Sequence, residues 1–239
     1  MRLLASGVVL SLGLVVGTPR CVGADVWGGS LGITSDYIVR GISRSNAAAA
    51  LQFDLHYLNG SGFVAGLFAS NTRFDSGDRR DVELDAFLGF AWSAGNDWRG
   101  KILASHYAYP WNQSGSGYDY DEFDVELSFQ EWLSAAITYS PNAWRYVRSV
   151  GLIGVNSGSA EISLQRPVLR RLSATAGIGY SRYDGPDARG FGYWSLGAAY
   201  DLAPVALVLS YVNTTAGAKA LFYNAAAGGR WTGTVIWRF

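Results

Sequence analysis

The chain has 239 residues, of which 49% are hydrophobic, 14% aromatic and only 16% charged, and its 19 basic residues balance its 19 acidic ones. Because no excess of Lys and Arg exists to neutralise phosphates, this balance argues against nucleic acid as a partner. The 30 Gly against 6 Pro favour strands and tight turns over helices.

The first 24 residues have the pattern of a cleaved secretory signal peptide. Arg2 begins an apolar stretch at residues 3–16, which is shorter than the roughly 20 residues that a membrane helix needs. Small residues then precede a cleavage site after Ala24. The mature domain would span residues 25–239, carry a small negative charge and contain no Cys, since Cys21 leaves with the peptide. A lipid anchor on Cys21 is the alternative interpretation.

After residue 24 the hydrophobic pattern has a period of two, as in strands that present one apolar and one polar face. Leu51, Phe53 and Leu55, for example, alternate with polar side chains. About twelve such stretches occur, at 26–40, 48–58, 63–73, 82–93, 98–109, 121–130, 132–141, 158–167, 171–183, 191–201, 204–213 and 230–239. Stretches of about ten residues suit tilted membrane strands. We therefore predict an all-β fold, a closed antiparallel transmembrane β-barrel of about 12 strands.

The connectors alternate in length, as in outer-membrane barrels with short periplasmic turns and longer extracellular loops. Short turns are predicted at 59–62, 94–97 and 201–204, and long loops at 72–81, 110–120, 184–190 and 213–229. The final loop folds inward as a constriction or stays on the surface. Two aromatic girdles are also predicted. One comprises Trp27, Tyr57, Trp92, Trp98, Trp132, Trp237 and Phe239 near the periplasmic side, and the other Tyr37, Tyr139 and Tyr180 near the opposite side.

A secreted soluble β-protein would also alternate, with its apolar face inward. Here the apolar face continues through nearly every stretch, and the chain ends on an alternating aromatic strand closed by Phe239. That ending resembles the signal read by the outer-membrane assembly machinery. The expected location is the bacterial outer membrane, and the expected partners are outer-membrane lipid, the assembly machinery through Phe239, and small polar solutes.

The end of the first stretch resembles a known family. Ser35-Asp36-Tyr37-Ile38-Val39-Arg40-Gly41-Ile42-Ser43 is similar to the S-D-Y-x-x-R-G-I-S signature of the TorF family, proteobacterial proteins described as porins. Residues 69–71, 118–122 and 194–197 resemble the family in the same order. The resemblance covers essentially the whole mature chain and implies an outer-membrane barrel with a transport role. The family often has Gln where Arg44 stands here, so no role is carried over to that position.

Polar faces of the predicted strands supply candidate pore-lining residues. These are Asp36, Arg40, Gln52, Asp54, His56, Glu83, Asp85, Arg99, Lys101, Asp124, Glu126 and Arg182. Most of the acidic ones would form one wall, faced by the basic ones, and charges of this kind bias ion choice. Asp36 and Arg40, four residues apart on one strand face, would either set selectivity at the outer mouth or form a structural ion pair. The lumen itself is either open or plugged.

The favoured function is therefore a porin or channel for passive passage of small polar solutes or ions, not an enzyme. A non-transporting structural or adhesion barrel is the first alternative. An outer-membrane esterase or phospholipase is the second, because His106 has the parity of the lipid face. Ser105 faces the opposite side, so a nucleophile would have to come from another strand. No metal-ligand or nucleotide motif occurs, and no cofactor is expected.

Overall fold

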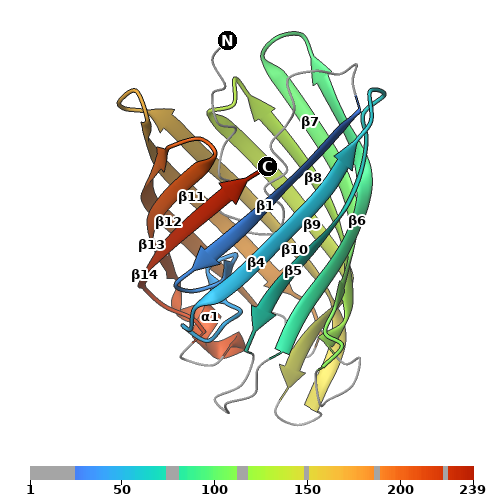
Figure 1. The fold of residues 1–239 in the computed structure, drawn as a ribbon. Coiled ribbons are helices and arrows are strands. Elements are labelled where there is room, and N and C mark those ends of the chain that lie inside the picture. Colours follow the sequence, from blue (N-terminus) through green and yellow to red (C-terminus); the bar gives the residue numbers. More distant parts are fainter. Residues whose placement is uncertain (1–24, 74–80, 112–117, 148–150, 186–188, 223–225) are drawn as a thin grey trace.

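The computed structural model describes residues 25–239 apart from 74–80, 112–117, 148–150, 186–188 and 223–225. The predicted signal peptide and its cleavage site lie outside the described residues. The described residues form a closed antiparallel barrel of twelve strands, as predicted (Figure 1). Its strands are β1 (Val26–Thr34), β4 (Ala50–Leu58), β5 (Phe63–Thr72), β6 (Asp81–Ala94), β7 (Trp98–Ala108), β8 (Tyr120–Phe129), β9 (Leu133–Val147), β10 (Gly151–Pro167), β11 (Leu172–Tyr183), β12 (Arg189–Asp201), β13 (Val205–Thr214) and β14 (Arg230–Arg238).

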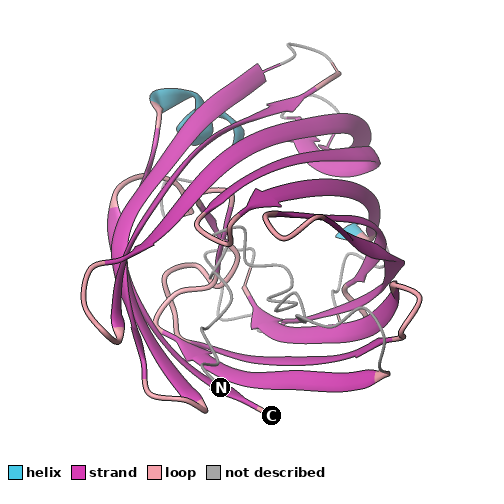
Figure 2. Cartoon of the chain, turned by 90° about the horizontal axis from the view of Figure 1, so that it is seen from above, coloured by secondary structure: helices cyan, strands magenta, loops and turns pink. Residues whose placement is uncertain are grey.

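The barrel closes where the first strand pairs with the last, and Figure 2 shows the resulting ring. Ser30 lies opposite Arg238, and Thr34 opposite Thr234. Beyond β14, Gly29 and Phe239 exchange two backbone hydrogen bonds of 3.0 Å each. Every barrel strand therefore has two hydrogen-bonded neighbours, which leaves no open sheet edge.

Turns and loops separate to opposite ends of the barrel, again as predicted. Four residues or fewer link β4 to β5, β6 to β7, β8 to β9, β10 to β11, and β12 to β13. These turns lie at the end where β1 begins and β14 finishes, which we call the turn end. The remaining connections lie at the other end, which we call the loop end, and they are longer except for the three residues between β9 and β10.

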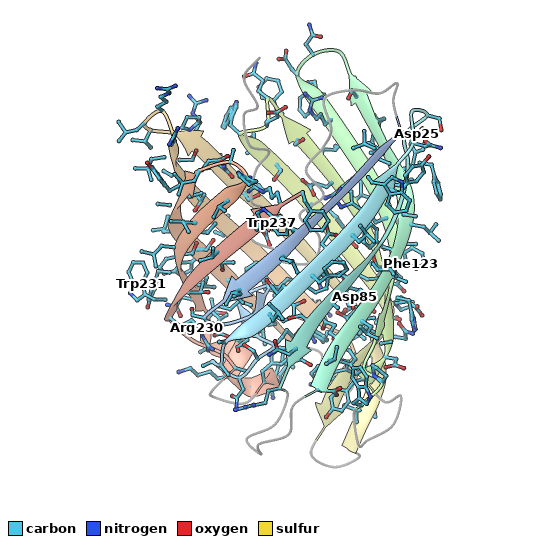
Figure 3. All side chains as sticks on the ribbon, in the orientation of Figure 1. Asp25, Asp85, Phe123, Arg230, Trp231 and Trp237 are labelled. Atoms are coloured by element: carbon cyan, nitrogen blue, oxygen red, sulfur yellow. The ribbon has the colours of Figure 1, made fainter. Side chains whose placement is uncertain are left out.

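Side chains alternate between the outside and the inside of the barrel as the period of two requires. Leu31, Phe53, Leu84 and Val125 are 38–46% exposed on the outer surface, whereas Asp54 and Glu83 are 3% and 1% exposed inside. Figure 3 shows Trp231 and Phe123 pointing away from the wall. The exposed hydrophobic surface is continuous around the strands, which is the arrangement of a barrel solvated by lipid.

The first predicted strand, 26–40, is wrong beyond residue 34, because β1 ends at Thr34. The Thr34 hydroxyl donates to the backbone carbonyl of Asp36 at 2.8 Å and turns the chain inward. A small hairpin of β2 (Ile38–Val39) and β3 (Ile42–Ser43) follows. Tyr37, predicted in the outer girdle, is instead 1% exposed inside the barrel, where its ring packs against Phe68. We call residues 35–49 the first loop.

The turn of this hairpin needs left-handed backbone at two successive positions. Arg40 has a φ of 50° and Gly41 a φ of 80°. A Cβ at Gly41 would also lie 2.7 Å from the Tyr193 Cβ atom. Glycine is the residue that meets both requirements.

Two strands are longer than predicted, and one helix was not predicted. Residues 142–157, expected to connect two strands, mostly extend β9 and β10 toward the loop end. The short helix α1 (Ala216–Leu221) lies in the connection from β13 to β14. None of the helices in the described part of the chain is long and apolar enough to cross a membrane.

Candidate functional site

Nine of the twelve predicted pore-lining residues lie on the inner face of the barrel strands. They are Gln52, Asp54, His56, Glu83, Asp85, Arg99, Lys101, Asp124 and Glu126. All come from β4 and β6 to β8. The inner faces of β9 to β14 carry many smaller side chains, including Ser163, Thr175, Ser195, Ser210 and Thr234, beside larger ones such as Glu161 and Tyr193.

Arg182 does not belong to this set, and its prediction is wrong. Its side chain is 63% exposed and lies near Asp184, with 3.5 Å between Nε and Oδ1. It shares the parity of Ile178 and Tyr180, which face outward, while Ser181 takes the inward position. Strict use of the alternation would have placed it correctly.

Asp36 and Arg40 do lie inside the barrel, but neither belongs to β1 and they do not pair with each other. The carboxylate of Asp36 pairs with the Arg230 guanidinium of β14, 3.1 Å from Oδ2 to Nη1. The hydroxyls of Ser43 and Ser45 donate to its other oxygen. Figure 3 shows Arg230 near the loop end of β14, where the first loop lies. Asp36 thus attaches the first loop to β14, one of the two strands that close the barrel.

Arg40 attaches the hairpin tip to a different part of the wall. Its Nη1 and Nη2 donate to the two oxygens of Glu122 on β8, at 2.7 and 2.6 Å. The Tyr107 hydroxyl adds a third hydrogen bond to this carboxylate at 3.2 Å. Bidentate pairing of a guanidinium with a carboxylate fixes both partners in one geometry. The first loop therefore extends from β1 into the barrel as far as β8.

A third attachment uses Glu83 of β6, which accepts hydrogen bonds from the hydroxyls of Tyr37 and Tyr109. Tyr37 lies in the first loop, and Tyr109 follows β7. Burial raises the pKa of both phenols well above the ordinary value for tyrosine, and the nearby Glu83 carboxylate raises it further. Both hydroxyls therefore stay protonated and donate.

The hairpin tip lies between two cavities, and Val39, Arg40, Tyr120 and Glu122 line both. The first, the loop-end cavity, has a volume of about 110 Å³. Aromatic rings and three guanidinium-bearing residues dominate its lining, among them Arg44, Arg73, Tyr118, Trp144, Tyr183 and Phe222. The Arg44 guanidinium carbon lies 5.9 Å from the Tyr120 ring centre and 5.7 Å from that of Trp144. Such contacts combine cation–π attraction with stacking.

The second, the central cavity, has a volume of about 50 Å³ and is acidic. Its carboxylates come from Glu83, Glu122, Asp124, Glu126 and Glu161, and its cations from Arg40 and Lys101. Glu122 and Glu161 are therefore site residues missing from the predicted set. Their sequence neighbours Phe123 and Ile162 face outward, so strand alternation places Glu122 and Glu161 inside the barrel. This pattern was visible in the sequence.

Part of the inner wall carries buried polar groups without a protein partner. Several buried polar atoms on the described strands have no protein partner, namely Gln52 Nε2, Asp54 Oδ2, both carboxylate oxygens of Asp85, Glu161 Oε1 and the hydroxyls of Ser140, Thr175, Ser181 and Ser210. Burying such groups in a dry interior costs a few kcal/mol each, on the order of 1–3 from protein data. A hydrated lumen removes that penalty.

The final loop contributes to the loop-end cavity in its described part. The Ser43 amide donates to the Ala226 carbonyl at 2.9 Å. Ala218 of α1 and Ala227 are buried in one cluster with Ile42 and Phe191. Of the two arrangements left open by the sequence, these residues follow the inward one and pack onto the first loop.

The outward-facing position that parity predicts for His106 is confirmed, since its side chain is 56% exposed. Its Nδ1 lies 2.8 Å from Asp121 Oδ1, and Asn142 donates to the other Asp121 oxygen at 2.9 Å. Ser105 is 6% exposed on the opposite face. Among the described residues, the polar contact of His106 is thus with a carboxylate and not with a serine nucleophile. In the described segments no group of three His, Cys, Asp or Glu residues is arranged to hold a metal ion.

Comparison with known proteins identifies a family and a fold. A family model described as "Bacterial protein of unknown function (Gcw_chp)" matches residues 23–238. No curated protein sequence matches the chain. Among solved structures, the NanC porin superposes with a TM-score of 0.53 at 11% identity, over 88% of this chain and 98% of the porin.

Two further solved structures are similar to the same extent. The KdgM porin has a TM-score of 0.51 at 10% identity, over 89% of this chain and 99% of the porin. An outer membrane channel from Pseudomonas putida F1 has a TM-score of 0.53 at 13% identity, over 95% of this chain and 98% of the channel. At these identities the likeness concerns the fold.

Proposed function

The chain belongs to the Gcw_chp family of bacterial proteins of unknown function, and we propose that it is a non-enzymatic outer-membrane channel for passive passage of small polar solutes or ions. The turn end would face the periplasm and the loop end the outside. The resemblance of residues 35–43 to the TorF signature supports the same function.

The location rests on the apolar outer surface and on the porin-like fold. Leu67, Leu88 and Ile137 are 56–66% exposed around the middle of the wall, which is favourable in lipid and unfavourable in water. We propose that residues 1–24 direct export and are cleaved after Ala24. Phe239 would then serve as the signal for the assembly machinery.

The observation that carries the channel function is the polar inner wall around the central cavity. A barrel closed by a dry plug would bury apolar or fully paired groups at its centre. Here the central cavity is lined by five carboxylates, and further polar atoms of the inner wall lack protein partners. Such a surface favours water inside the barrel over a dry interior.

We propose that the channel prefers cations. The central cavity contains five carboxylates against two cationic side chains. An excess of negative charge in a low-dielectric tube raises the local concentration of cations and lowers that of anions. The narrowing by Arg40 and Glu122 would restrict passage to small solutes.

Single-channel recording in planar bilayers tests the function. Purified protein whose folding is verified by heat-modifiable migration on gels should produce discrete current steps. Protein that is folded by this criterion and never conducts would exclude the channel. The second candidate, a non-transporting structural or adhesion barrel, would then be favoured by the first loop, which is attached at Asp36, Tyr37 and Arg40.

A further inference from the structure

The central cavity is lined by more carboxylate groups than cationic side chains. Lys101 Nζ lies 2.9 Å from Glu126 Oε2, and Arg40 pairs with Glu122, so each cation already has one carboxylate. Glu83, Asp124 and Glu161 are bound by hydroxyl groups instead, from Tyr37 and Tyr109, Thr138, and Tyr193. Three carboxylates therefore face this cavity without a cationic partner among the contacts of the described residues.

Glu161 gives the clearest indication of a binding site. It is 8% exposed and lines the central cavity. Its Oε2 accepts from the Tyr193 hydroxyl at 2.9 Å, while Oε1 is buried without a protein partner. A carboxylate oxygen in this state is a strong acceptor for a charged donor, because little else competes for it.

Strand register explains why space remains beside this carboxylate. Glu161 on β10 lies opposite Ala136 on β9, which in turn lies opposite Glu126 on β8. The alanine methyl between the two acids leaves the volume that a larger side chain would fill. In the adjacent row, Asp124 is followed across the wall by Thr138 and Ser159. Both hydroxyls line the cavity and supply further acceptors.

We propose that the central cavity binds the ammonium group of a small organic cation at Glu161 and Asp124. An ammonium group has three donors and no acceptor, which matches carboxylate and hydroxyl oxygens. A volume of about 50 Å³ holds only a few water-sized groups, so it suits an ammonium headgroup and not a bulky solute. The inference deepens the channel function and rests on it, because the solute reaches this cavity through the lumen.

Titration calorimetry with putrescine, on folded protein in detergent, tests the site without requiring conduction. Wild-type protein should bind putrescine and not 1,4-butanediol, its neutral counterpart. Glu161→Gln and Asp124→Asn should each weaken binding about tenfold or more, the usual effect of losing a hydrogen bond between charged groups. Glu131→Gln is the matched control, because this carboxylate pairs with Arg99 near the turn end and does not line the cavity.

Ala136→Leu provides a second variant that keeps both carboxylates. It fills the cavity from β9 and should also abolish binding, which keeps the test valid if a charge variant fails to fold. Equal affinity in wild-type and Glu161→Gln protein, or equal binding of the diol, would overturn the inference.

Bilayer recordings separate this inference from the channel function. Current steps that putrescine blocks in the wild type, and blocks at least about tenfold more weakly in Glu161→Gln, support both. Steps without any putrescine binding leave the channel intact and overturn the binding site. Binding without steps supports the site and refutes the channel.

Discussion

Arg40 and Glu122 form a bidentate ion pair that links the tip of the first loop to β8, with nitrogen–oxygen distances of 2.7 and 2.6 Å. The side chains are 14% and 3% exposed, so solvent screens the pair only in part. The pair separates the loop-end cavity from the central cavity. Both residues line both cavities, so we expect changes at this pair to affect barrel stability and conductance together.

Arg40→Ala should lower the free energy of unfolding by about 3–5 kcal/mol, because Glu122 loses its charged partner while it stays buried. The double variant Arg40→Ala/Glu122→Ala should recover part of that loss, since no uncompensated charge remains. It should also raise single-channel conductance. Urea unfolding in detergent and bilayer recording measure the two effects. A double variant as unstable as Arg40→Ala would contradict the pairing argument.

Asp36→Asn should release the first loop from the closing strands. The substitution removes the charge that binds Arg230 and two serine hydroxyls, and we expect a loss of about 2–4 kcal/mol in the free energy of unfolding. Asp201→Asn is the matched control. Its partner Arg238 lies 3.8 Å away, and both side chains are 28% exposed, so its loss should stay below about 1 kcal/mol. Similar losses in both variants would refute a special role for Asp36.

Asp85→Lys combined with Asp124→Lys should shift ion selectivity toward anions, because two charges inside the lumen reverse their sign. The reversal potential under a potassium chloride gradient measures this shift. Asp85→Asn/Asp124→Asn should move it in the same direction by a smaller amount and with less risk to folding. Asp97→Lys, in the turn between β6 and β7, should leave the potential close to that of the wild type. A reversal potential that is unchanged in all three variants would contradict the interpretation that acidic residues form one wall of the lumen.

Leu88→Arg should destabilise the barrel in lipid by about 2–4 kcal/mol, because a charge would enter the middle of the hydrocarbon layer. Leu88 is 57% exposed on the outer face of β6. Leu202→Arg is the control, because Leu202 is also exposed, at 42%, but lies in a turn. There the loss in the free energy of unfolding should be about 0–1 kcal/mol. The free energies of unfolding of the two variants are compared in lipid vesicles. Equal costs would argue against a membrane around the middle of the wall.

Phe239→Ser separates a structural from a recognition role of the last residue. The hydrogen bonds between Gly29 and Phe239 use backbone atoms, so they persist in the variant. Refolding of purified protein in detergent should therefore change little, whereas the amount assembled in cells should fall. If assembly in cells is normal, the proposed signal is not the side chain of Phe239.

Several features of this protein were predictable from local sequence alone. The alternation of Leu51, Phe53 and Leu55 with Gln52 and Asp54 placed a strand and both of its faces correctly. Lipid on one side and a polar lumen on the other impose a period of two, so neither strand positions nor facing requires knowledge of distant contacts. The same rule would have excluded Arg182 and included Glu161.

Only the tertiary structure decided which residues contact one another inside the barrel. Tyr37 and Val39 continue the apolar parity of the first predicted strand, and nothing local indicates that Tyr37 turns inward to Glu83 or that Arg40 reaches Glu122. Those partners lie on β6 and β8, and their distance depends on barrel curvature, strand tilt and register. Period alone determines which face a side chain takes. Which inward residues meet across the lumen depends on how the sheet closes.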